Sequence, residues 1–85
     1  MKNDKTSHWN YRVMSHFDAD MDEHYFEIHE VYYNDLEEVI NWGEESSCPF
    51  GEDASSLQKT VKMMNDAFNK PVLDYETGKE IISND

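Results

Sequence analysis

The stretch YFEIHEVYY, residues 25–33, decides the fold. Its β-branched and aromatic residues are typical of a strand and unusual in an exposed helix. Successive side chains of a strand point to opposite faces of the sheet. One face of this segment carries Phe26, Ile28, Glu30 and Tyr32, whereas the other carries Tyr25, Glu27, His29, Val31 and Tyr33. We therefore predict a strand with two different faces, one of which is interrupted by a glutamate.

The flanking segments predict two more strands. Upstream, the apolar residues Trp9, Tyr11, Val13 and Phe17 recur at mostly two-residue spacing, with Asn10, Arg12 and His16 on the opposite side. The acidic stretch DADMDE, residues 18–23, supplies a turn. Downstream, residues 39–42 read as a short third strand, although residues 36–40 also suit a helical turn. A third strand is favoured because a two-stranded sheet is marginal in water.

One helix completes the predicted domain. Ser55 and Gln58 match a capping box. Leu57, Val61, Met64 and Phe68 then form an apolar stripe with helical spacing, and Pro71 ends the helix. The predicted fold is α+β: a three-stranded antiparallel sheet with one helix packed on one face, in the order β-β-β-α. We expect a flexible N-terminus over residues 1–8, a single domain over residues 9–76, and a frayed C-terminus over residues 77–85.

Charge is the most unusual feature of the composition. Nineteen acids against seven lysines and arginines give a net charge of −12. No lysine or arginine lies between Arg12 and Lys59, whereas thirteen acids fall there. These acids attract cations and basic protein surfaces. Direct binding to nucleic acid is disfavoured because phosphates are neutralised by lysine and arginine.

The acids raise the question of a calcium loop, because Asp18, Asp20 and Asp22 alternate as in the first half of an EF-hand. An EF-hand loop has glycine at its sixth position and glutamate at its twelfth. Counted from Asp18, these positions hold Glu23 and His29. The predicted flanks are strands and not helices. We therefore interpret the stretch as an acidic hairpin turn.

Other chemistry has little support in the sequence. His24 and His29 are five residues apart, which places them on opposite faces of a strand. Cys48 is the only cysteine and has no CxxC or CxxH neighbour, so neither a zinc site nor a disulfide is predicted. We expect no catalytic residues, no metal and no cofactor. The single cysteine and the lack of a long apolar run favour a cytoplasmic protein that does not contact a membrane.

Several short motifs resemble known families. Residues 11–13 (YRV), 28–33 (IHEVYY), Trp42, Pro49-x-Gly51, Leu57 and 71–73 (PVL) resemble a family of small uncharacterised bacterial and phage proteins. That resemblance covers most of residues 9–73 and implies no activity. The order of elements is more distantly similar to the N-terminal domain of HicB-type antitoxins. This second resemblance implies a small basic ribonuclease toxin as partner, although residues 72–85 are too short for the DNA-binding segment that such antitoxins usually add.

These observations leave three functional hypotheses, all based on binding and not on catalysis. The first is an inhibitor of a basic nucleic-acid-binding protein, as phage anti-CRISPR and DNA-mimic proteins are. The second is a HicB-like antidote that binds a basic toxin. The third is an acidic domain of another role, and the sequence also leaves open a homodimer. The predicted partner-binding residues are Asp18, Asp20, Asp22, Glu23, Tyr25, Glu27, Glu30, Tyr33, Asp35, Glu37, Glu38, Trp42, Glu44 and Glu45, with the three aromatic residues as anchors.

Overall fold

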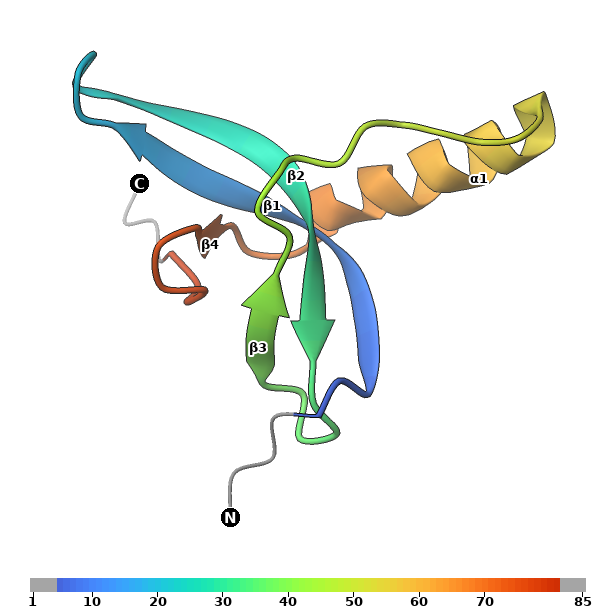
Figure 1. Ribbon diagram of the computed structural model, residues 1–85, viewed down its shortest axis with the longest axis horizontal. Helices are drawn as coiled ribbons and strands as arrows, with labels where there is room; N and C mark the ends of the chain where they lie inside the picture. The colour runs from blue at the N-terminus through green and yellow to red at the C-terminus, as the bar shows by residue number, and fades with distance from the viewer. Residues whose placement is uncertain (1–4, 82–85) are drawn as a thin grey trace.

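The computed structural model describes residues 5–81 of the chain and shows an α+β fold with one α-helix and a four-stranded mixed sheet (Figure 1). Its elements are β1 (His8–Asp18), β2 (Glu23–Tyr33), β3 (Val39–Trp42), α1 (Ala54–Asn65), the 3₁₀ helix η1 (Asp66–Asn69) and β4 (Leu73–Asp74). The strand order across the sheet is β3-β2-β1-β4. The α+β class is thus confirmed, but the prediction of three antiparallel strands missed β4. This two-residue strand pairs parallel to β1 and is too short to show a period of two.

The long hairpin of β1 and β2 dominates the sheet. Its antiparallel register runs from His8 opposite Tyr33 to Asp18 opposite Glu23. The Asp18 carboxylate accepts hydrogen bonds from the backbone N–H groups of Asp20 (3.0 Å) and Met21 (3.3 Å), which closes the turn. The acidic stretch is therefore a hairpin turn, as predicted. Strand β1 begins inside the segment that was expected to be flexible, whereas residues 1–4 lie outside the described part of the chain.

The third strand follows a turn that is organised by Asn34. The Asn34 side-chain oxygen accepts hydrogen bonds from the backbone N–H groups of Leu36 (3.0 Å) and Glu38 (2.9 Å). Its amide group donates to the Glu38 carboxylate at 2.8 Å. These bonds reverse the chain so that β3 pairs antiparallel to β2. The alternative of a helical turn over these residues is thereby settled in favour of the strand.

The hydrophobic core lies on one face of the sheet, which we call the core face. It consists of the side chains on the same side as Met14, Val31, Tyr33 and Leu73, all of which are buried. Buried Arg12 adds polar contacts, because its guanidinium donates to the Tyr33 hydroxyl (2.8 Å) and to the Pro71 carbonyl (2.7 Å). The second of these bonds ties the segment before β4 to the middle of β1.

The C-terminal segment folds back over this core. The backbone N–H of Gly78 donates to Asp74 at 2.7 Å, and that of Ile81 donates to Val72 at 2.8 Å. Gly78 has a φ of +73° and sits against the ring of Trp42, where a Cβ would lie 2.4 Å from a ring carbon. The segment that was expected to be frayed is therefore bonded, over residues 77–81, to the residues around β4. Its remainder, residues 82–85, lies outside the described part of the chain.

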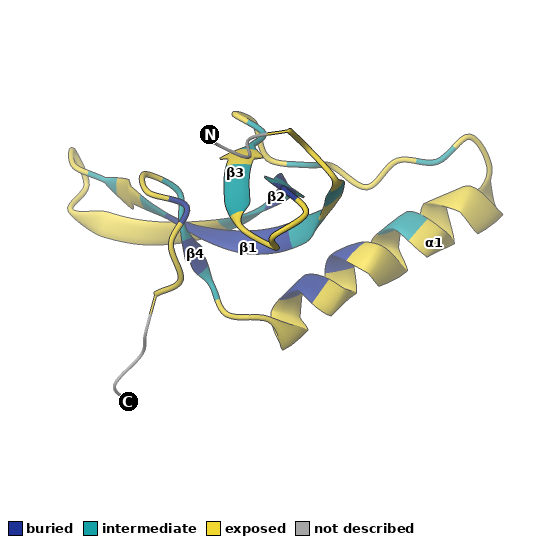
Figure 2. Cartoon of the chain, turned by 90° about the horizontal axis from the view of Figure 1, so that it is seen from below, coloured by how far each residue is buried: buried dark blue, intermediate teal, exposed yellow. Residues whose placement is uncertain are grey.

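The opposite face of the sheet, which we call the helix face, carries Val13, Phe26 and Ile28 and meets α1. The helix is capped by Asp53, whose carboxylate accepts from the Ser56 N–H at 2.8 Å, and not by Ser55 as predicted. Within the predicted stripe only Met64 is buried (Figure 2). The other three members, Leu57, Val61 and Phe68, are 39%, 46% and 66% exposed.

The stripe prediction therefore fails for most of the helix, because α1 approaches the sheet only at its C-terminal end (Figure 1). The N-terminal turns extend away from the sheet at the end of the loop that follows β3. As predicted, helical structure stops before Pro71, with η1 ending at Asn69 and Lys70 extended. Among residues 5–81, no helix combines the length and apolar character needed to cross a lipid bilayer.

Candidate functional site

The structure divides the predicted acidic residues into separate groups. The hairpin-tip group lies at the far end of β1 and β2 and consists of Asp18, Asp20, Asp22 and Glu23. The pocket group lies beside the middle of the hairpin and consists of Glu27, Glu44 and Glu45. The distal-turn group connects β2 to β3 and consists of Asp35, Glu37 and Glu38. Because β2 has eleven residues, about 34 Å of strand separates the hairpin-tip group from the distal-turn group.

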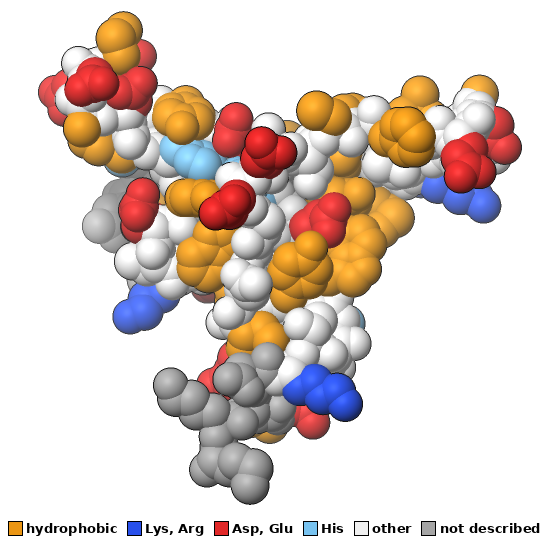
Figure 3. Space-filling model, in the orientation of Figure 1, with side chains coloured by type: hydrophobic (Ala, Val, Ile, Leu, Met, Phe, Trp, Pro, Cys, Tyr) orange, Lys and Arg blue, Asp and Glu red, His pale blue; other side chains and the backbone are white. Residues whose placement is uncertain are grey.

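The first two groups can be followed on one side of the molecule (Figure 3). Acidic side chains gather there at the hairpin tip and again near the middle, with further acids at the start of α1. Glu30 does not join them, because it lies on the helix face and accepts a hydrogen bond from the Tyr32 hydroxyl at 2.7 Å. That hydrogen bond raises the pKa of Tyr32 above its usual value.

The three predicted aromatic anchors have different environments. Tyr25 is 45% exposed and is available to a partner. Tyr33 is only 6% exposed, because its ring belongs to the core and its hydroxyl donates to the Asn10 side chain at 2.8 Å. Trp42 packs against the core beside Tyr75. The prediction that Tyr33 is an exposed anchor is therefore wrong, and Trp42 contributes mainly to the core.

Two histidines and a glutamate converge on the core face, just beyond the hydrophobic core. The Nε2 atoms of His16 and His29 are 2.9 Å apart. One carboxylate oxygen of Glu27 lies 3.3 Å from the first of these nitrogens and 3.4 Å from the second. We call these three residues the histidine–glutamate cluster. Within residues 5–81, no other group of three histidine, cysteine or acidic side chains brings its ligand atoms this close.

The hydrogen bonding of His29 fixes its tautomer. Its side chain is fully buried, and its Nδ1 lies 2.9 Å from the backbone carbonyl oxygen of Gly43. A carbonyl oxygen only accepts hydrogen bonds, so Nδ1 carries the proton. In the neutral ring the lone pair is therefore on Nε2 and points into the cluster. The hydrogen bond between the two rings then requires His16 to donate from its Nε2.

The ring of His16 is held between two tyrosines. Tyr25 stacks on it with a centroid separation of 4.8 Å, and Tyr75 stacks on it at 4.3 Å. The Tyr75 hydroxyl donates to the Glu44 carbonyl at 3.1 Å, which fixes the second tyrosine. Burial lowers the pKa of His16, and the negative charge of Glu27 opposes that shift. Because both tyrosines pack against its ring, His16 has little freedom to change its orientation.

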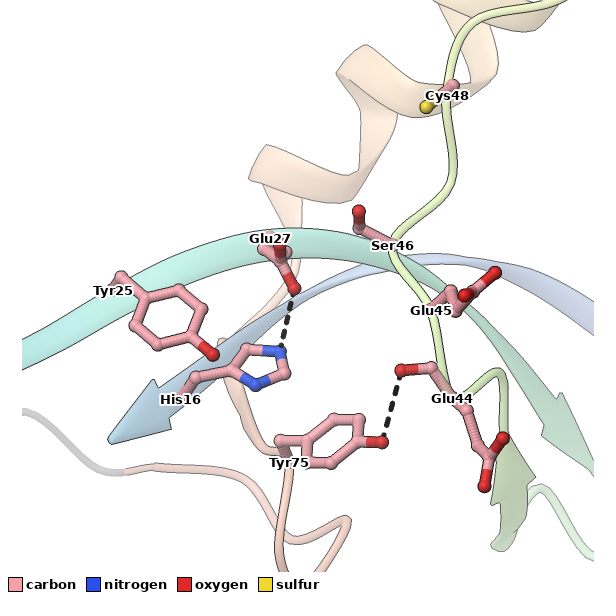
Figure 4. Close-up of a pocket in the computed structure, with 8 residues that line it drawn as sticks. All are labelled: His16, Tyr25, Glu27, Glu44, Glu45, Ser46, Cys48 and Tyr75. Carbon is pink, nitrogen blue, oxygen red and sulfur yellow. Dashed lines mark hydrogen bonds and ion pairs between the residues drawn. The ribbon is translucent and has the colours of Figure 1, made fainter. Parts of the chain in front are cut away.

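A pocket of about 580 Å³ opens onto the cluster (Figure 4). It is lined by His16, Tyr25, Glu27, Glu44, Glu45, Ser46, Cys48 and Tyr75. Figure 4 shows His16 beneath Glu27, with Tyr25 and Tyr75 on either side of its ring. Cys48 lies further along the loop, away from His16. The pocket thus reaches His16 and Glu27 of the cluster from the side that carries Glu44 and Glu45, whereas the buried His29 does not line it.

The cluster was not predicted from the sequence, because the spacing of His29 from its neighbour His24 does not indicate that His29 meets His16 across the hairpin. His24 is exposed, points to the helix face and rests against Phe17. The register of the hairpin contained the missing signal. With the turn at residues 19–22, His16 lies opposite Tyr25, and Glu27 and His29 follow on the same face.

Comparison with known proteins does not assign a family. No protein-family model, curated protein or solved structure matches the chain.

Proposed function

We propose that this chain is a small acidic binding protein that docks on the basic surface of a nucleic-acid-binding protein and blocks it, acting by binding and not by catalysis. The observation that carries the proposal is the row of side chains beyond the core on the core face. Glu23, Tyr25 and Glu27 alternate along β2 with their side chains on this face, and Asp18 lies opposite Glu23. The row thus combines acids with an exposed aromatic residue.

No lysine or arginine lies near this row in the sequence to neutralise its negative charge. Arg12 is the last basic residue before Lys59, and its guanidinium is buried, where it bonds to Tyr33 and Pro71. The face therefore presents a negative potential to solvent. Such a potential accelerates the encounter with a Lys/Arg-rich groove. Added salt removes this advantage, because the Debye length falls from about 10 Å at 0.1 M to about 3 Å at 1 M.

The test begins with a partner that is captured from host lysate and is released by competing duplex DNA. Association rates are then measured at low and high salt for two variants that each lose three charges. The hairpin-tip variant is Asp20→Asn/Asp22→Asn/Glu23→Gln. The distal-turn variant, Asp35→Asn/Glu37→Gln/Glu38→Gln, is its matched control at the other end of β2.

We expect the hairpin-tip variant to associate more slowly and to show a flatter salt dependence than the distal-turn variant. Tyr25→Ala is expected to speed dissociation instead, because a packed aromatic residue acts mainly after encounter. If neither triple variant changes association, the acids serve only to solvate the protein and the proposal is wrong. If only the distal-turn variant changes it, the partner binds elsewhere.

A further inference from the structure

The histidine–glutamate cluster has a geometry that a hydrogen-bond network alone does not require. Three potential ligand atoms, two imidazole nitrogens and one carboxylate oxygen, lie 2.9–3.4 Å from one another. Ligand atoms about 2.0–2.1 Å from a tetrahedral zinc ion lie about 3.3 Å apart. We infer that His16, Glu27 and His29 form a binding site for a Zn²⁺-type transition-metal ion, with a fourth position that is open to the pocket.

The distances require little movement to admit an ion. Both contacts of Glu27 already match the spacing of ligands around one tetrahedral centre. Only the two histidines, at 2.9 Å, must separate by a few tenths of an ångström. The proton that His16 donates from Nε2 moves through solvent to its own Nδ1, so that both Nε2 lone pairs face the ion. No net charge has to be buried other than that of the ion, which the glutamate partly offsets.

The surroundings of His29 provide the support that metal ligands usually have. A ligating histidine commonly donates its second N–H to a carboxylate or a backbone carbonyl, which fixes its orientation. His29 does so through Nδ1 and the carbonyl of Gly43, at 2.9 Å. His16 is restrained differently, because the rings of Tyr25 and Tyr75 stack against its imidazole. Two of the three ligands are thus held in place before an ion arrives.

The donor set selects the class of metal. Imidazole nitrogen suits zinc, copper, iron and nickel, whereas magnesium and calcium prefer oxygen ligands throughout. A site with two nitrogens and one oxygen therefore favours a transition metal over the alkaline earths. Glu44 and Glu45 line the pocket and add negative potential along the route of entry.

The direct test is calorimetric titration of Zn²⁺ into the chelator-treated, tag-free chain, with Co²⁺ absorption as a second readout of nitrogen coordination. We expect one ion per chain and a rise in melting temperature, because an ion that binds only the folded chain stabilises it. His16→Ala is expected to weaken binding by at least about 100-fold, since even changes behind the ligands cost about 10- to 100-fold. Mg²⁺ and Ca²⁺ should leave the melting temperature unchanged.

Two further variants keep the test decisive. Glu27→Gln retains a similar shape at a partly exposed site and should also weaken Zn²⁺ binding, with circular dichroism confirming that it folds. His24→Ala, which removes an exposed histidine from the same hairpin, is the matched control and should bind as the unmodified chain does. Absence of binding, or equal affinity in His16→Ala and His24→Ala, overturns the inference. Glu27 belongs to both the cluster and the proposed partner surface, but the Zn²⁺ titration contains no partner protein and the hairpin-tip variant leaves all three proposed ligands in place, so failure of one proposal is distinguishable from failure of the other.

Discussion

Along the β1–β2 hairpin, the helix face carries more apolar side chains than the core face, but the two faces are buried to different extents. On the core face, Met14 and Val31 are completely buried, together with the polar side chain of His29. On the helix face, Phe17 and Phe26 remain 50% and 61% exposed although both are large and apolar. The face that looks more hydrophobic in the sequence is thus the less buried one.

The difference comes from the segments that cover each face. The segment around β4 is fastened to β1 at several points, including the bond from Arg12 to the Pro71 carbonyl and the bond from the Tyr75 N–H to Ser15. On the helix face, α1 and η1 contribute only Met64 and Ala67 as buried residues of their own. Alternation along a strand therefore shows which residues share a face, but their burial depends on which other segments pack against that face.

The comparison predicts unequal effects of truncation on the two faces. Met14→Ala on the core face should lower the free energy of unfolding by about 2–5 kcal/mol, because it leaves a cavity in a fully enclosed core. Phe68→Ala, which removes a larger side chain that is 66% exposed, should cost less than about 1 kcal/mol. Urea denaturation of both variants measures the difference. Equal losses would show that η1, which contains Phe68, packs on the sheet more tightly than the structure indicates.

Much of the sheet was predictable from local pattern. The three antiparallel strands follow from β-branched and aromatic residues between turn signals, and Asp18 and Asn34 both organise their turns through side-chain oxygens. Strand β4 could not be predicted in this way, because its pairing depends on the long-range bond from Arg12 to Pro71. The exposure of Leu57 could not be predicted either, because helical spacing does not determine how the helix axis is oriented relative to the sheet.

The candidate site was predictable only in part. The concentration of acids on the hairpin could be read directly, since it depends on composition and on the position of one turn. The histidine–glutamate cluster required the hairpin register, which places His16 diagonally opposite Glu27 across β1 and β2. The carbonyl of Gly43, which fixes the tautomer of His29, comes from the loop after β3 and has no signature in the sequence.

A second prediction concerns the cover of the core face. Gly78→Ala should lower the free energy of unfolding by about 1–3 kcal/mol, because a side chain at φ +73° is strained and its Cβ would overlap the Trp42 ring. Gly43→Ala is the matched control, since the added Cβ would lie 3.6 Å from the nearest neighbouring atom, the Glu45 carbonyl oxygen, and the φ of Gly43 is not positive. Thermal melting of both variants tests whether residues 77–81 pack on the core. Equal melting temperatures of the two variants would show that residues 77–81 do not pack on the core.

The last and smallest effect concerns α1, whose first turn extends away from the sheet and depends on its own cap. The Asp53 carboxylate accepts the Ser56 N–H, and this bond lowers the pKa of Asp53 below its usual value. Because the folded chain favours the ionised form, the cap stabilises the helix at neutral pH, and its contribution is lost as the pH falls through the lowered pKa. Asp53→Ala should therefore reduce helical circular dichroism slightly at pH 7 and make that signal less dependent on pH in the acid range. Ser55→Ala, at the position that the sequence pattern favoured as the cap, should leave both unchanged. If Ser55→Ala has the larger effect, the helix begins as the sequence pattern predicted, and its first turn is held differently from the arrangement in the structure.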